Sequence, residues 1–408
     1  MRRGTLRIPA WTIAAFGIAV LVPACGSSED PNTAGGQGPG AGQSGTTDTA
    51  PPTPDEQVKQ ILDQRKTDYG EALRTASLKL RDELPTLVEI NRIANAPDDA
   101  AKKVAYEGMI DGMLADPKFT KIMVKFWKDT LRTGQVGAIQ TGQPNKDLAA
   151  NFAAQVTVEG RSYSELFTAT SNTCPTFDAA TSTFTAASCA GTTVGVLTDP
   201  GIQAQYFANM AFRRVRFIQE TFACSKFPAE FSATPTPMGS GTYTNPWDFN
   251  KLTGKQNTPA AKIDFQDTSA VICANCHNTL NRLAPLFLNY DANGVMQATS
   301  QVAVPVPNNP KAGLADYLQP GEPLAWRFGH TITDVATLGQ AMSADPDVAA
   351  CAVNRVWNYA LSRGDIVNDL ATIPAAVTAP LVKDFQGNGM KLKETIRAVF
   401  KSEDFTKF

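Results

Sequence analysis

Histidine is nearly absent from this chain of 408 residues, which contains only His277 and His330. Metal sites built from several histidines are therefore excluded, and no Ser-His-Asp arrangement with usable spacing is present. The sequence also has no glycine-rich phosphate loop. Hydrolysis by a serine triad and nucleotide hydrolysis are consequently not indicated.

Long hydrophobic runs and basic runs are missing as well. The apolar run at residues 11–22 is too short to predict a membrane span. The net charge is −2, and the first 24 residues hold three arginines and no acid, so the remainder has 34 bases (37 − 3) against 39 acids. This weakly acidic composition gives no reason to expect nucleic acid as a partner.

The N-terminus has the pattern of an export signal. A basic start and a short apolar run predict a signal peptide over residues 1–24, which ends in Val22-Pro23-Ala24-Cys25. This ending resembles the lipobox of bacterial lipoproteins, in which the cysteine is lipidated and becomes the mature N-terminus. The resemblance implies a membrane anchor at Cys25, and Gly26 after it favours the outer membrane, on the periplasmic or cell-surface side.

Residues 25–54 are rich in Gly, Ser, Thr and Pro and contain almost no large apolar residue. This composition predicts a flexible, lipid-anchored linker. Helical periodicity begins after it, with an amphipathic stretch from about Pro54 to Thr75. Thr86 to Glu89 forms a capping box, and Asp98 is a predicted cap for a helix that ends near Leu114.

Two later helices are predicted to begin with a capping aspartate and a proline at the first helical position, and each is expected to end at a glycine. The first begins at Asp116-Pro117 and ends at Gly134, and the second begins at Asp345-Pro346 and ends at Gly364. A third Asp-Pro pair, Asp199-Pro200, predicts a helix that continues to Cys224. The pattern as a whole predicts a mainly α protein with long irregular loops.

The segment from Cys273 to His277, Cys-Ala-Asn-Cys-His, is the most informative motif of the chain. Its spacing places two thiols one helical turn apart, where they can add to the two vinyl groups of a haem, and directs the following histidine at the iron. A zinc site would need two more ligands, and a redox dithiol is typical of a βαβ context, which the sequence does not indicate. We therefore predict one covalently bound haem c, with His277 as an iron ligand.

Four cysteines remain after Cys25 and the haem pair are set aside: Cys174, Cys189, Cys224 and Cys351. An even number in an exported protein is typical of disulfide bridges, here two. Three pairings exist. The short separation of Cys174 and Cys189 favours a local bridge between them, which leaves Cys224 to pair with Cys351.

Several stretches resemble the planctomycete-type cytochrome-c-like proteins, an exported mono-haem family built from domains of unknown function. The resemblance covers most of the mature chain and is most specific at the haem block. Asn281-Arg282 departs from that family, which usually has Asp-Pro after the haem histidine. The stretches that carry the resemblance are Leu84-Pro85-Thr86, Leu114 to Phe119, Leu197 to Pro228, Cys273 to His277 with Phe287 to Asp291 and Gly294, Cys351 to Trp357, and Ser402 to Phe405.

Together these observations predict a helical N-terminal domain at residues 55–198 and a helical, c-type-cytochrome-like haem domain at residues 199–408. The second axial ligand of the iron is open between His330, Met342 or another methionine, and no ligand at all. Arg213, Arg214 and Arg216 could pair with a haem propionate or form a solvated helix face.

The expected function is electron transfer at the cell envelope with a redox partner protein. The alternatives are a haem enzyme such as a peroxidase, although a di-haem peroxidase would need a second C-x-x-C-H, and a binding or assembly module stabilised by haem. A single haem does not carry electrons far, so long-range transfer would need another cytochrome or a homo-oligomer of stacked copies.

Overall fold

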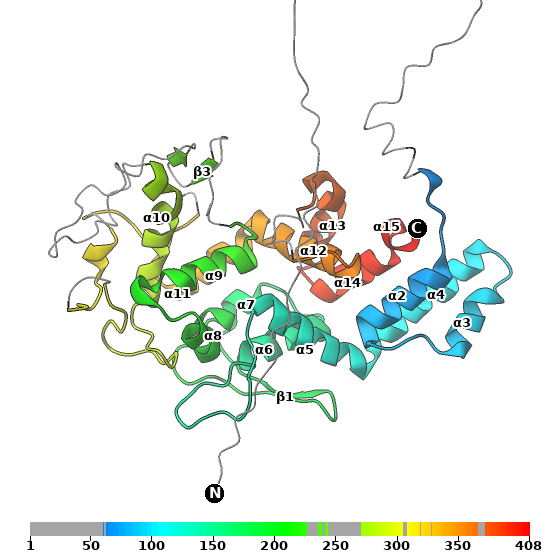
Figure 1. Cartoon of the computed structure of the whole chain (residues 1–408), viewed down its shortest axis with the longest axis horizontal. Coiled ribbons are helices and arrows are strands. Elements are labelled where there is room, and N and C mark those ends of the chain that lie inside the picture. The colour runs from blue at the N-terminus through cyan, green and yellow to red at the C-terminus, as the bar shows by residue number, and fades with distance from the viewer. Residues whose placement is uncertain are drawn as a thin grey trace, which may run out of the picture. The chain divides into compact units, whose positions relative to one another are not determined.

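The computed structural model describes residues 60, 63–226, 236–238, 241–243, 271–304, 308–318, 320–327, 329–365 and 372–408, and at 236–238, 241–243, 271–275 and 278 it describes the backbone alone. The chain divides into two units, Met1–Gln60 and Ile61–Phe408. The signal peptide, Cys25 and the linker predicted for residues 25–54 all lie outside the described residues. Within the second unit the protein is mainly α, as the sequence predicted (Figure 1).

The first part of the second unit is a succession of helices. The early helices α2, α3 and α4 pack on one another, and α5 packs along α6 (Figure 1). Their bounds are α2 Tyr69–Arg81, α3 Leu87–Ala94, α4 Asp99–Ala115, α5 Pro117–Leu131, α6 Leu148–Val158 and α7 Glu165–Thr168.

The second part contains the predicted haem motif, in α10, and the C-terminal helices. The helices are η1 Gly195–Thr198, α8 Pro200–Gln205, η2 Asn209–Ala211, α9 Phe212–Phe222, α10 Val271–Leu283, η4 Ala284–Phe287, η5 Leu314–Asp316, α11 Val335–Ala344, α12 Pro346–Ala360, α13 Ala375–Gly387, α14 Leu392–Lys401 and α15 Glu403–Thr406.

Strands are short and form three antiparallel hairpins within the described residues. The first hairpin lies between Cys174 and Cys189 and has Phe177 opposite Phe184. The third pairs Trp326 with His330. The strands are β1 Thr176–Asp178, β2 Thr183–Thr185, β3 Thr236–Met238, β4 Gly241–Tyr243, β5 Ala325–Trp326 and β6 His330–Thr331.

The predicted helix starts are confirmed by their hydrogen bonds. The Thr86 side chain accepts from the Glu89 backbone N–H at 3.2 Å, and the Glu89 carboxylate accepts from the Thr86 backbone N–H at 2.8 Å, which completes the capping box. Asp116 and Asp345 each accept a backbone N–H two residues further on, ahead of a proline at the first helical position. Local polar spacing therefore determines where these helices begin.

Several predicted helix bounds were wrong. The helix expected over Pro54 to Thr75 is interrupted, because residues 60, 63 and 64 are helical, residues 65–68 are not, and α2 begins at Tyr69 with Asp68 as its cap. The helix expected from Pro200 to Cys224 is broken, since Met210 and Ala211 have φ of 58° and 53° and Met210 bonds the Ala303 carbonyl. The helices expected to end at Gly134 and Gly364 end at Leu131 and Ala360.

One continuous hydrophobic core joins the two halves of the second unit. It contains side chains from both sides of residue 198, among them Leu197 and Ile202, and extends from α2 to α15. Phe119, Met123 and Trp127 of α5 are fully buried in it. The domain boundary expected at residues 198 and 199 thus falls inside this core.

The beginning and the end of the second unit are hydrogen-bonded together. The Lys66 N–H donates to the Phe408 carbonyl at 2.9 Å, and the Phe408 N–H donates to the Lys66 carbonyl at 3.0 Å. Because α2 follows directly, these bonds place its N-terminal end beside Phe408.

Candidate haem-attachment site

The motif from Cys273 to His277 occupies the first two turns of α10. In a helix, residues three and four positions apart share a face, so positions 273, 276 and 277 lie on one side of α10. The helix packs against α9, η4, β5 and the β3–β4 hairpin (Figure 1). The backbone of α10 thus places the three positions of the C-x-x-C-H motif on one helix face.

His277 is oriented by a hydrogen bond within its own helix. Its Nδ1 lies 3.0 Å from Oδ1 of Asn281, one turn further on. Since that oxygen can only accept, Nδ1 carries the proton and Nε2 carries the lone pair. Burial lowers the pKa of His277, while the bond to Asn281 acts in the opposite direction. The imidazole is therefore held neutral, the form that binds metals.

The ring of Phe212 packs against the imidazole, and Tyr317 packs against Phe212 in turn. The Phe212 ring, at the start of α9, meets His277 edge to face at a centroid distance of 5.1 Å, and it meets Tyr317 in the same way at 5.8 Å. Tyr317 is almost fully buried, and Cys276, which belongs to neither disulfide, is half-buried. The surroundings of His277 are thus largely apolar and exclude much of the water.

Arg214 fixes the chain that follows α10. Its guanidinium is buried and donates to the carbonyls of Gln203, Phe287, Tyr290 and Asp291 at 2.8–3.2 Å. Burial lowers its pKa to about 10, which leaves it charged at neutral pH. The sequence suggested that Arg214 pairs with a haem propionate or lies on a solvated helix face. Neither role applies, because its N–H donors bind buried backbone carbonyls. Its neighbour Arg216 is exposed and bonds Glu220 at 2.7 Å.

A tight turn after η4 contains Asp291 and Gly294, two residues of the stretch that resembles the cytochrome-like family. The Asp291 carboxylate accepts from the backbone N–H groups of Asn293 and Val295 at 2.9 Å. Gly294 has φ of 73°, and a Cβ there would lie 1.9 Å from the Pro200 carbonyl oxygen. Only glycine allows this approach, which joins the turn to α8.

The two candidates for the distal iron ligand lie in different surroundings. His330 is exposed in β6, opposite Trp326 of β5, and β5 packs against α10. Met342 is fully buried in α11, a helix that packs against α7 and η1. The hairpin therefore brings His330 to the neighbourhood of α10, whereas Met342 is part of the core.

Both disulfides form with the pairing favoured from sequence. Cys174 pairs with Cys189 and Cys224 with Cys351, each with a Cα–Cα distance of 5.3 Å. Asp199 lies beside the first bridge, with Oδ2 3.8 Å from Cys174 Sγ, and burial raises its pKa to about 7. It caps α8 by accepting the Ile202 N–H at 2.9 Å.

Within the part of the chain that the structure describes, Cys174, Cys189 and Asp199 are the one group of three side chains close enough to share a metal ion. Their sulfurs are joined in a disulfide and provide no thiolate. The chemistry of this donor set therefore favours a structural role.

The donor set on α10 fits haem c. Two cysteine positions share a helix face with His277, whose Nδ1 is hydrogen-bonded to Asn281. A histidine that binds a metal through one ring nitrogen usually donates a hydrogen bond from the other. Sequence reasoning missed Asn281, Phe212 and Tyr317. The spacing of four residues between His277 and Asn281 was the one available signal, since the aromatic rings come from distant segments.

No helix in the described ranges combines the length and the apolar character needed to cross a membrane. Comparison with protein-family models, with curated proteins and with solved structures gives no match to this chain.

Proposed function

We propose that this protein is a mono-haem c-type cytochrome that transfers electrons at the cell envelope. The observation that carries the proposal is the C-x-x-C-H motif on α10, in which Nδ1 of His277 is hydrogen-bonded to Asn281. When bound, the haem would supply a one-electron couple. Cys273 and Cys276 would attach it, and His277 would hold its iron.

The residues around the motif have supporting roles in this proposal. Asn281 would fix the direction of the imidazole, and the rings of Phe212 and Tyr317 would limit the access of water to it. His330 on the β5–β6 hairpin, Met342 or another methionine, or no residue would occupy the distal side. A redox partner protein would exchange electrons with the exposed edge.

The proposed location is the outer membrane. A lipid on Cys25 would anchor the chain there, and residues 25–54 would form the linker. The presence of two disulfides agrees with an oxidising compartment outside the cytosol. Self-association into a homo-oligomer would be one way to extend electron transfer beyond a single haem.

Absorption spectra of the matured full chain, oxidised and reduced, would test the proposal. We expect a covalent haem band that is lost in Cys273→Ala/Cys276→Ala and sharp low-spin bands that do not respond to cyanide or carbon monoxide. Absence of any haem band from the mature protein would refute the cytochrome assignment. High-spin bands that shift with either ligand would replace electron transfer by a haem enzyme or a ligand-binding module.

The distal ligand can be assigned in the same experiment. His330→Ala converts the spectrum to high spin if His330 is the ligand, and Met342→Leu does so if Met342 is. The exposed position of His330 predicts that His330→Ala leaves the fold intact, so that a spectral change would report coordination alone.

A further inference from the structure

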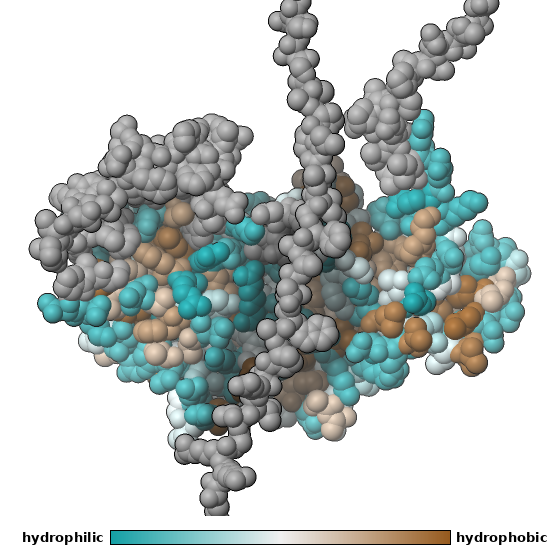
Figure 2. Space-filling model, in the orientation of Figure 1, coloured by the Kyte–Doolittle hydropathy of each residue, from teal (hydrophilic) through white to brown (hydrophobic). Residues whose placement is uncertain are grey.

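Apolar side chains are turned outward around α3. Leu87 and Val88 are 76% and 77% exposed, although they occupy the first turn of a helix that buries only Ile93. Figure 2 shows hydrophobic surface gathered over this part of the molecule. The outward-facing residues, called the α3 patch below, are Leu84, Leu87, Val88, Ile90 and Val104.

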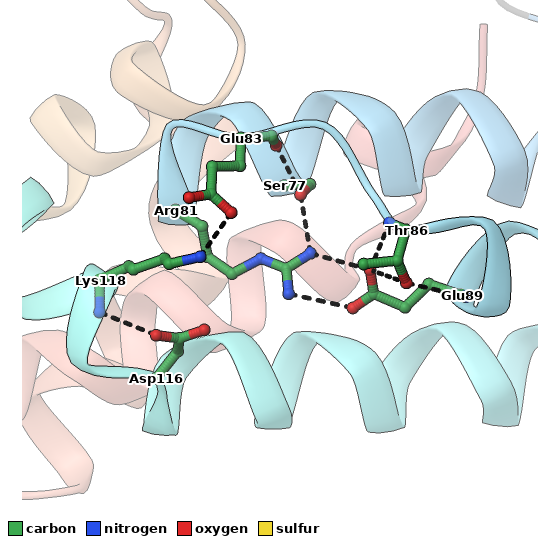
Figure 3. A network of polar contacts seen from close by, with 7 residues as sticks. All are labelled: Ser77, Arg81, Glu83, Thr86, Glu89, Asp116 and Lys118. Atoms are coloured by element: carbon green, nitrogen blue, oxygen red, sulfur yellow. Dashed lines mark hydrogen bonds and ion pairs between the residues drawn. The ribbon is translucent and has the colours of Figure 1, made fainter.

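Polar contacts hold the α3 patch in place from beneath (Figure 3). Arg81 at the end of α2 donates from both terminal nitrogens to the Glu89 carboxylate, at 3.0 and 3.1 Å, and also to Ser77 Oγ at 2.8 Å. Ser77 in turn donates to the Glu83 carbonyl at 2.7 Å. The turn before α3 and the helix itself are thereby tied to α2.

A second tie comes from α5. Lys118 pairs with the Glu83 carboxylate at 2.5 Å, and the Lys118 backbone N–H donates to Asp116 (Figure 3). Partial burial opposes ionisation of Glu89, but its hydrogen bonds to Arg81 and Thr86 lower its pKa, so the network is charged at neutral pH. The patch is therefore a fixed surface.

The exposure of apolar side chains on α3 departs from the usual arrangement of a surface helix. A surface helix of a globular protein turns its apolar side chains to the core and its charges to water. Here Glu89 and the buried Ile93 occupy the inner side of α3, whereas Leu87, Val88 and Ile90 face outward beside the polar Asn91 and Arg92. Exposed apolar side chains gathered in one place are typical of a surface that contacts another apolar phase.

The length of chain before α2 indicates what that phase is. Lys66, which is fixed to Phe408, follows Cys25 by 41 residues (66 − 25). As a flexible chain, the linker predicted for residues 25–54 would span about 30 Å on average, and α2 adds about 20 Å to the position of the patch. A lipid on Cys25 would thus keep the α3 patch within reach of the membrane at a high effective concentration.

We propose that the α3 patch docks on the phospholipid surface to which the chain is anchored, with Leu84, Leu87 and Val88 entering the boundary between headgroups and acyl chains. The inference rests on the lipid anchor of the proposed function. Residues 81–104 carry five acids and four bases, so attraction to anionic lipid is not needed, and the contact is with zwitterionic phospholipid. A stable dimer would use about 20 residues per partner, far more than the five of this patch.

Fluorescence quenching by brominated lipid tests this proposal. The full lipidated chain is placed on phosphatidylcholine vesicles, with or without bromine near the top of one acyl chain, as Leu87→Trp and as the control Val136→Trp. Val136 is 93% exposed and lies outside the α3 patch. Because each variant is compared with itself on unbrominated vesicles, quenching by other groups in the protein cancels.

We expect the added fluorescence of Leu87→Trp to be quenched at least threefold more strongly than that of Val136→Trp, and Val88→Asp in the same chain to abolish the difference. Added salt should not change it. Equal quenching at the two positions would overturn the inference. So would dimers of the unanchored Cys25→Ser chain that bury position 87.

Vesicle flotation and the absorption spectrum test the lipid anchor and the haem separately in the same samples. A mature chain that does not float with the vesicles would overturn the anchor and the docking together, whatever its absorption spectrum. A chain that floats and shows the quenching difference but has no haem band would overturn the cytochrome assignment and leave the docking standing.

Discussion

His277 depends on Asn281 for its orientation. The contact spans a single helical turn, and its direction follows from chemistry, because an amide oxygen only accepts. A hydrogen bond to Nδ1–H increases the electron donation of the imidazole through Nε2. At an iron this favours the oxidised state, so Asn281 would act on the potential of the proposed haem.

Replacing Asn281 by leucine should raise the midpoint potential. The change keeps the volume, removes the acceptor and weakens the donation by His277. We expect a rise on the order of 20–60 mV, since 59 mV corresponds to tenfold for one electron. Spectroelectrochemical titration of the matured protein measures it, with the exposed Asn293→Ala as the control. An unchanged potential would show that Asn281 does not act on the ligand.

Residue-scale features were predictable where both partners are close in sequence and form a standard helix cap. Thr86 with Glu89, and the aspartates before Pro117 and Pro346, form their caps as the spacing indicated. The contacts of His277 with Phe212 were not predictable, because nothing in the spacing of the two residues relates their side chains. The motif alone therefore indicated the candidate site, while the residues packed around it depend on tertiary structure.

At the scale of elements, Arg214 connects three pieces of chain. From α9 it binds the C-terminal part of α8 and the carbonyls in and after η4, more than 70 residues away. The Arg-Arg-x-Arg pattern suggested an exposed or propionate-binding face, since the sequence does not show that the helix is broken before Phe212. The positive φ at Met210 and Ala211 turns α9 so that Arg214 points inward.

Arg214→Lys should destabilise the protein although it keeps the charge. An ammonium cannot reproduce the planar fork of donors, so several buried carbonyls lose their partner. We expect a loss of about 2–4 kcal/mol in the free energy of unfolding, measured by urea denaturation. The matched control is Arg213→Lys on the same helix, where the exposed side chain should change stability by less than about 0.5 kcal/mol. Equal effects at the two positions would contradict this role of Arg214.

At the scale of the whole molecule, the second unit is closed by contacts between distant parts of the chain. Its ends meet at Lys66 and Phe408, and Tyr106 of α4 donates to the Phe400 carbonyl of α14 at 2.6 Å. The mainly α class followed from helical periodicity. The single core did not, because the sequence suggests a boundary at residue 198 without showing that apolar side chains on both sides of it pack together.

The two disulfides constrain very different lengths of the unfolded chain. Cys174 and Cys189 are 15 residues apart, and Cys224 and Cys351 are 127 residues apart. In the chain-entropy description a bridge stabilises by restricting the unfolded state, by about 3 kcal/mol for the shorter loop and about 5 kcal/mol for the longer one. The bridge between α9 and α12 is thus expected to be the stronger constraint on the whole fold.

Removal of each bridge should reveal that difference. We expect Cys224→Ala/Cys351→Ala to lower the free energy of unfolding by about 2 kcal/mol more than Cys174→Ala/Cys189→Ala, as measured by urea denaturation followed by circular dichroism. The unsubstituted protein with both bridges intact serves as the reference for both. Equal losses would mean that the long bridge acts through its local contacts, chief among them Arg355, whose guanidinium lies 3.8 Å from Cys351 Sγ and 3.9 Å from Cys224 Sγ.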